Sequence, residues 1–141
     1  MYMSKDVGTT ALCQCQERDN GVFEFTFFAD DYHAVDQWAD RIEQLQLAGK
    51  WYGKPVVHLL LDTRNSGQLP LRYLFECLSD YNREYPHLQP PHVRLAYVHS
   101  SSFTMLDVFK MFATLLPVPT VAEFFTEDEY DDAMNWVLAN D

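Results

Sequence analysis

Hydrophobic and polar positions along the chain follow several distinct patterns, and the first is that of two β-strands. Residues 9–17 ("TTALCQCQE") and 22–28 ("VFEFTFF") flank the turn Asp19-Asn20-Gly21. An Asn-Gly pair tolerates positive φ and favours a tight reversal of the chain. The pattern therefore predicts an antiparallel β-hairpin.

The next stretch repeats its apolar residues with the 3.6-residue period of a helix. Asp30 or Asp31 can cap the helix N-terminus, and Gly49 is placed to end it. We therefore expect a helix over roughly residues 31–48. Its apolar positions are Val35, Trp38, Ala39, Ile42 and Leu45.

Two later stretches, residues 55–62 ("PVVHLLLD") and 92–99 ("HVRLAYVH"), are almost continuously apolar. Strands that are covered on both faces of a sheet have this composition, so we expect two central strands. A helix should begin near Pro70, because proline suits a first turn, and "YPHLQPP" at 85–91 should end it. Its apolar stripe is Leu71, Leu74, Leu78 and Tyr81.

The last third of the chain predicts a helix at 103–116, a short strand at about 119–125 and a final helix. Thr126 is followed three residues later by Glu129, which is the spacing of a capping box. The acidic run "EDEYDD" suits the positive end of the helix dipole. Ala133, Trp136 and Val137 should pack this final helix onto the sheet, and we expect both Trp38 and Trp136 to be substantially buried.

The predicted order of elements is ββαβαβαβα, with right-handed crossovers between parallel strands. We expect one small α/β domain over residues 9–141, preceded by an N-terminal tail at 1–8. Its mixed, mostly parallel sheet should have about five strands and four helices, with the antiparallel hairpin at one edge.

Composition and charge argue against nucleic acid as a partner and against a membrane span. The chain of 141 residues is 48% hydrophobic and carries a formal net charge of −11. A chain this acidic has too few clustered cations to bind nucleic acid. The apolar runs are shorter than the roughly 18–20 residues of a membrane span. The odd number of cysteines and an N-terminus without signal-peptide features indicate a reducing, cytoplasmic setting.

Three segments together resemble a known family. They are the strand ending in "LLLD", the strand "VRLAYV" and the ending "FFTEDEYDDAMNWV" with its Ala133 and Trp136. With the hairpin, they resemble the SpoIIAA-like proteins of the STAS superfamily, whose fold is also compared with lipid-binding CRAL-TRIO domains. The resemblance implies a non-catalytic bacterial signalling domain that needs no cofactor and binds a protein partner. It is also compatible with a homodimer.

The polar residues that follow the two central strands form the best candidate site. Carboxyl ends of parallel strands meet at one edge of a sheet, where α/β proteins gather their ligand sites. We name this set the recognition edge: Asp62, Arg64, Asn65, Ser66, His99, Ser100, Ser101 and Ser102. A purely structural interpretation also fits, in which Asp62 and the serines cap helices and Arg64 pairs with an acid.

In regulatory STAS proteins a serine beside an aspartate in this loop is phosphorylated. The resemblance makes Ser66 the candidate phosphorylation site, although the family's Asp-Ser-Ser/Thr-Gly pattern is replaced here by Asn65-Ser66-Gly67.

The same loop raises two further possibilities, a catalytic site and a nucleotide-binding site. A small hydrolase could use Asp62, Ser66 and His99, but no G-x-S-x-G elbow surrounds the serine. The loop after residue 62 has one glycine and no lysine, which excludes a nucleotide-binding loop.

The aromatic residues raise an alternative function, the binding of a small apolar or lipid-like ligand. We favour it less than protein binding, because aromatics in a small domain usually form the core. The residues concerned are Trp51, Phe103, Phe109, Phe112, Phe124 and Phe125.

Metal binding is not expected. Cys13 and Cys15 should lie on one face of a strand, but neither they nor the histidines show the paired spacing of a zinc site. The acidic residues at 127–132 lack the order of an EF-hand loop.

Overall fold

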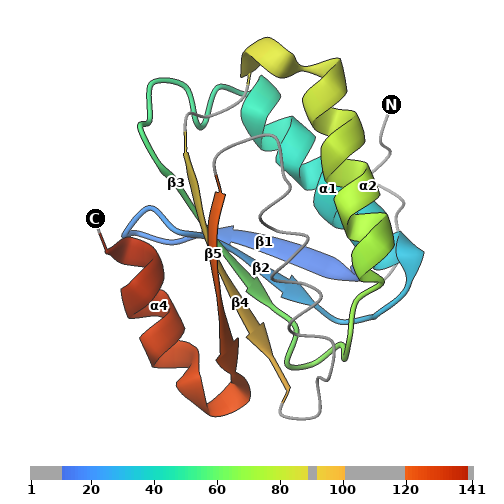
Figure 1. Cartoon of the computed structure of the whole chain (residues 1–141), viewed down its shortest axis with the longest axis vertical. Helices are drawn as coiled ribbons and strands as arrows, with labels where there is room; N and C mark the ends of the chain where they lie inside the picture. Colours follow the sequence, from blue (N-terminus) through green and yellow to red (C-terminus); the bar gives the residue numbers. More distant parts are fainter. Residues whose placement is uncertain (1–10, 89–91, 101–119, 140–141) are drawn as a thin grey trace.

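The computed structural model describes residues 11–88, 92–100 and 120–139 (Figure 1). The tail predicted at 1–8 and the helix predicted at 103–116 lie outside the described residues, as do three of the aromatic residues named above, Phe103, Phe109 and Phe112.

A five-stranded mixed sheet with the order β1-β2-β3-β4-β5 forms the centre of the fold. β1 (Cys13–Glu17) and β2 (Phe23–Phe27) are antiparallel, and the predicted Asn-Gly turn joins them with Gly21 at a φ of 93°. β3 (Val57–Asp62), β4 (Val93–His99) and β5 (Thr120–Thr126) continue the sheet in parallel. The predicted fold class, a small α/β domain with an antiparallel hairpin at one edge, is confirmed.

Helix α1 (Tyr32–Leu47) has the N-cap that the sequence predicts. The Asp31 carboxylate accepts a hydrogen bond of 3.1 Å from the backbone N–H of Ala34. After the helix, Gly49 adopts a φ of 78°, in the region where glycine is favoured. Helix α2 (Leu71–Glu84) begins directly after Pro70, which occupies the N-cap position and not the first turn.

The predicted capping box is present, but it caps a short turn that precedes the final helix. The backbone N–H of Thr126 donates to Oε1 of Glu129 over 2.9 Å. The three residues after Thr126 form the 3₁₀ turn η2 (Glu127–Glu129), and α4 (Tyr130–Leu138) follows it. A second 3₁₀ turn, η1 (Pro86–Leu88), follows α2.

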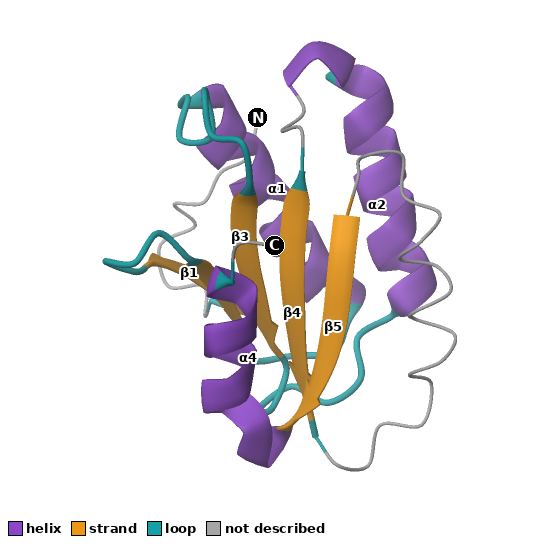
Figure 2. Ribbon diagram, turned by 60° about the vertical axis from the view of Figure 1, so that its left-hand side comes forward, coloured by secondary structure: helices purple, strands orange, loops and turns teal. Residues whose placement is uncertain are grey.

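Helices cover both faces of the sheet, as the apolar runs predicted. α1 and α2 lie on one face, and α4 lies on the other (Figures 1 and 2). Successive residues of a strand alternate between faces, so Leu59 and Leu61 join the core beneath α1 and α2. Leu60 joins a smaller cluster beneath α4, whose members are Val22, Leu60, Ala96, Val98, Ala133 and Val137.

The two tryptophans expected in the core differ in burial. Trp38 on α1 is 1% exposed and meets Phe25 edge to face. Trp136 on α4 is partly buried and packs against the smaller cluster, so most of its surface is covered, although less completely than that of Trp38. Its ring is covered by Arg94, whose guanidinium carbon lies 3.9 Å from the ring centroid. Arg94 of β4 thus covers one face of the Trp136 ring on α4.

Candidate functional site

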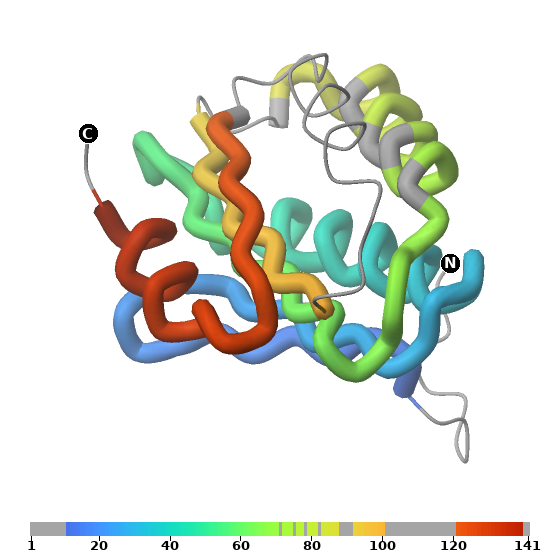
Figure 3. Tube along the Cα trace, turned by 60° about the horizontal axis from the view of Figure 1, so that its bottom comes forward, coloured from blue at the N-terminus to red at the C-terminus, as the bar shows by residue number. Residues whose placement is uncertain are grey.

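The carboxyl ends of β2, β3, β4 and β5 meet at one edge of the sheet, where the segment 28–31, the loop 63–70 and the turn η2 lie together (Figures 1 and 3). Asp62 ends β3 and is 3% exposed. The loop that follows it holds Arg64, Asn65 and Ser66 in a turn. Asp62 and the loop residues that follow it therefore lie at the carboxyl edge of the sheet, as the order of elements predicted.

Asp62 is paired with Arg64 through two side-chain hydrogen bonds. Nε of Arg64 donates to Oδ1 over 2.9 Å, and Nη2 donates to Oδ2 over 2.8 Å. The backbone N–H of Arg64 also donates to Oδ1 over 3.1 Å. Asp62 therefore does not cap a helix, which corrects the structural interpretation for this residue. The same interpretation is right for Arg64, which pairs with an acid.

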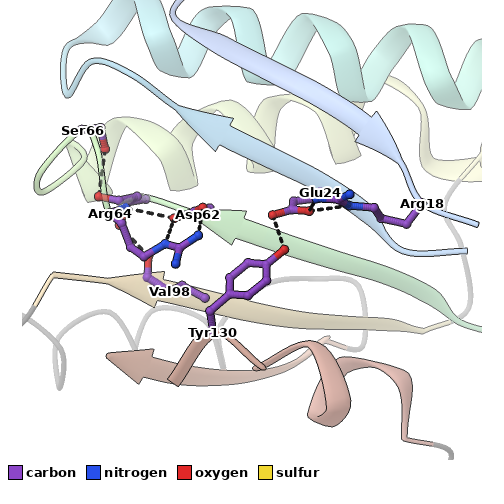
Figure 4. A network of polar contacts seen from close by, with 8 residues as sticks. Arg18, Glu24, Asp62, Arg64, Ser66, Val98 and Tyr130 are labelled. Atoms are coloured by element: carbon purple, nitrogen blue, oxygen red, sulfur yellow. Dashed lines mark hydrogen bonds and ion pairs between the residues drawn. The ribbon is translucent and has the colours of Figure 1, made fainter. Parts of the chain in front are cut away.

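The pair belongs to a larger polar network that crosses from the sheet to α4 (Figure 4). The guanidinium of Arg64 lies 4.4 Å from the ring centroid of Tyr130, and the Tyr130 hydroxyl donates to Glu24 over 2.6 Å. Arg18 completes the network with a 2.7 Å hydrogen bond from Nε to the other oxygen of Glu24. We call these five residues the polar network: Arg18, Glu24, Asp62, Arg64 and Tyr130.

Glu24 was missed by reasoning from the sequence. It is 4% exposed, between the buried residues Phe23 and Phe25 of β2. Phe23 and Phe25 face the core beneath α1, so Glu24 faces the opposite side, where α4 lies. A lone carboxylate in an otherwise apolar strand was the available signal. Its partners could not be read from the sequence, because they come from other elements.

Ser66 is half-buried within its own loop. Its hydroxyl donates to the carbonyl of Gly67 over 3.0 Å and lies 3.4 Å from the carbonyl of Thr63. Gly67 has a φ of 84°, and a Cβ atom added to it would lie 3.8 Å from a carboxylate oxygen of Asp30. The loop is therefore seated against the segment that follows β2. Asn65 and Gln68 remain exposed on its outer side.

His99 does not join Asp62 and Ser66 in a catalytic arrangement. Asp62 stands opposite Val98 in the β3–β4 register, so His99, the next residue, faces the other side of the sheet. Its ring lies 6.5 Å from that of the core residue Tyr97, and its Nδ1 is 2.7 Å from the carbonyl of Ser100. With the Asp62 carboxylate paired to Arg64, the geometry does not assemble the Ser-His-Asp triad that a hydrolase would require. Ser101 and Ser102 lie outside the described residues.

The cysteines and the remaining aromatics belong to the packing of the domain. Cys13 and Cys15 share the predicted face and pack beside the core beneath α1, and burial raises the pKa of Cys15 to about 11. Within residues 11–88, 92–100 and 120–139, no three His, Cys, Asp or Glu side chains are grouped to hold a metal. Trp51 and Phe124, two of the aromatic residues expected to line an apolar ligand site, lie in the core beneath α1 and α2.

Stability is expected to fall in alkali because of Tyr130. Burial, together with the hydrogen bond to Glu24, raises the pKa of Tyr130 to about 12 from an ordinary 10.0. The unfolded chain therefore loses this proton at a lower pH than the folded chain does. The contribution of protonated Tyr130 to the free energy of unfolding is therefore fully present below pH 10, and it is lost as the pH rises towards 12.

Urea unfolding at a series of pH values should show that the free energy of unfolding falls more steeply above pH 10 for the native chain than for Tyr130→Phe. Tyr97, whose pKa burial also raises to about 12, contributes the same background loss to both proteins. Equal slopes for the two proteins would contradict the assignment to Tyr130.

Comparison of the chain with protein-family models, with curated proteins and with solved structures finds no match. Among the helices of the described residues, none has the length and apolar character required to cross a membrane.

Proposed function

We propose that this chain is a non-catalytic protein-interaction module of the regulatory type that its resemblance to SpoIIAA-like proteins implies. The observation that carries the proposal is that the polar groups of Asp62 and Ser66 at the recognition edge are already hydrogen-bonded within the protein. Asp62 is buried and fully engaged by Arg64, and the hydroxyl of Ser66 is bonded within its own loop. These groups hold the loop in one shape, which suits a surface for recognition better than a centre for acid–base chemistry.

The outer side of this edge has the composition of an interface. Asn65 and Gln68 are exposed, and two large aromatics that follow β2 are partly exposed, Phe28 at 44% and Tyr32, the first residue of α1, at 60%. The side chain of Arg64 is about one third exposed. Aromatic residues and arginine are enriched where proteins bind each other. We call these five residues the carboxyl-edge surface: Phe28, Tyr32, Arg64, Asn65 and Gln68.

The test uses three substitutions that leave the polar network intact. Phe28→Ser, Asn65→Ala and Gln68→Ala, made together, should abolish recovery of the partner from an extract of the native host, with folding verified by circular dichroism. The matched control changes three exposed residues, the last residue of α1 and two in the segment that follows it: Leu47→Ser, Tyr52→Ala and Lys54→Ala. It should recover the partner as the native chain does. Equal recovery by both variants would refute the carboxyl-edge surface.

Ser66 remains the candidate phosphorylation site. A phosphate adds about −1.5 to −2 charges, and beside Arg64 it would compete with Asp62 for the guanidinium. Ser66→Asp should therefore change recovery of the partner, while Ser66→Ala should not. Identical recovery with both substitutions would argue against regulation at this residue.

A further inference from the structure

Strand β1 leaves part of its backbone unpaired at the edge of the sheet. Two hydrogen bonds of the hairpin, from Phe28 N–H to Leu12 and from Arg18 N–H to Val22, fix which residues face β2. These two bonds and the register place Gln14 and Gln16 as the residues that exchange hydrogen bonds with β2, so the backbone groups of 13, 15 and 17 point outward. In the part of the chain that the structure describes, no strand lies beyond β1.

One end of this free edge is closed by a side chain of α1. Oε1 of Gln37 accepts hydrogen bonds from the N–H groups of Leu12 and Cys13, at 2.8 and 3.0 Å. The N–H and C=O groups of Cys15 and Glu17 therefore form the open part of the edge. This part contains neither a proline nor a bulge, and its one charged side chain is that of Glu17.

Helix α1 runs alongside β1 and sets a cation beside the open edge. Gln37 contacts Cys13, the first residue of β1. Lys50, which follows the helix, lies 3.4 Å from Glu17, the last residue of β1. Arg41 is one helical turn beyond Gln37, about 6 Å along the axis, which brings it level with Cys15. Burial raises the pKa of Cys13 and of Cys15, and the positive charge of Arg41 acts in the opposite direction on both thiols. Arg41 is exposed and makes no ion pair with any described residue.

We propose that a second copy of this chain binds at β1, with the two β1 strands antiparallel about a twofold axis at Gln16. In this register Cys15 of each copy stands opposite Glu17 of the other. Each such pair exchanges two backbone hydrogen bonds, so every open N–H of Cys15 and Glu17 meets an open C=O of the other copy. The hydrogen bonds from Leu12 and Cys13 to Gln37 stay in place. The two sheets become one continuous sheet.

Charge complementarity supports a second copy as the occupant. Cys13, Cys15 and Glu17 share one face of β1, the face over which α1 lies. In the proposed register Glu17 of one copy stands opposite Cys15 of the other and so comes within reach of the other copy's Arg41. This contact occurs twice by symmetry. On the opposite face, the neutral and exposed Gln16 of each copy meet at the axis, where like charges would repel.

Disulfide trapping tests the register. In a background with Cys13, Cys15 and Cys77 changed to serine, Gln16→Cys should form a covalent dimer under mild oxidation. The two residues would be a non-hydrogen-bonded pair with Cα atoms about 4.5 Å apart, within the range of a disulfide. Gln14→Cys is the matched control, because its two copies would lie four residues apart, about 13 Å. Equal trapping at both positions, or none at Gln16→Cys, would overturn the register.

Sedimentation velocity tests the interface in the native background. Glu17→Pro removes an N–H that points away from β2, so the hairpin keeps its hydrogen bonds while the dimer is lost. Arg41→Glu should weaken dimerisation about tenfold, because two attractive contacts become repulsive. Adding Glu17→Arg to Arg41→Glu should restore it. A native chain that stays monomeric at every concentration, or a double variant as weak as the single one, would overturn the proposal.

This interface is separate from the carboxyl-edge surface. Loss of the dimer in Glu17→Pro with unchanged recovery of the protein partner would leave the proposed function intact. Loss of partner recovery in the carboxyl-edge variant with an unchanged dimer would leave this inference intact.

Discussion

Replacing Trp38 with alanine is expected to lower the free energy of unfolding by about 3–5 kcal/mol. The indole is 1% exposed, and its ring centroid lies 6.3 Å from that of Phe25 at an interplanar angle of 80°. Truncation removes this packing between α1 and the sheet and leaves a cavity that the neighbouring residues can close only in part. Equilibrium unfolding in urea measures the loss, with the midpoint shifted and the slope unchanged.

The matched control for Trp38 is Tyr52→Ala. Tyr52 is 93% exposed, so its truncation should change the free energy of unfolding by less than about 0.5 kcal/mol. Trp136 offers an intermediate case, because it is half-buried and covered by Arg94. A loss below about 1 kcal/mol for Trp38→Ala would mean that the core tolerates its removal, and would contradict the assignment.

Much of this fold could be predicted from the sequence, because burial leaves a periodic trace in the chain. The unbroken apolar run of β3 predicted a strand covered on both faces, and Leu59 and Leu60 do face different helices. The apolar period of α1, with Asp31 before it and Gly49 after it, gave both ends of that helix. These signals are local, and each depends only on residues within a few positions of one another.

The pairing of polar groups could not be predicted in the same way. Tyr130 and Glu24 are 106 residues apart in the chain and meet only after α4 has packed on the sheet. The sequence placed Asp62 and His99 at one edge correctly, but it did not show that they face opposite sides of the sheet. That distinction depends on the register between β3 and β4. A register shift of one residue would exchange the faces.

Replacing Arg18 with alanine is expected to cost about 2–3 kcal/mol, because it leaves the buried carboxylate of Glu24 without its cation. The side chain of Glu24 is 5% exposed, and Arg18 approaches one of its oxygens to 2.5 Å. Arg83→Ala is the matched control. Arg83 pairs with Asp80 over 3.1 Å, but both side chains are more than 70% exposed, so its loss should cost less than about 0.5 kcal/mol. Equal losses for the two arginine variants, measured by unfolding in urea, would contradict the buried role of Glu24.

A double-mutant cycle extends this prediction to the docking of α4. The Tyr130 hydroxyl donates to the second oxygen of Glu24, so Glu24→Gln and Tyr130→Phe should not have additive effects on the free energy of unfolding. We expect a coupling of about 1 kcal/mol, the usual net value of one hydrogen bond. Hydrogen exchange should become faster in α4 when either partner is changed, because this bond links the first turn of the helix to β2. Additive losses with unchanged exchange in α4 would show that the helix is held by its apolar face alone.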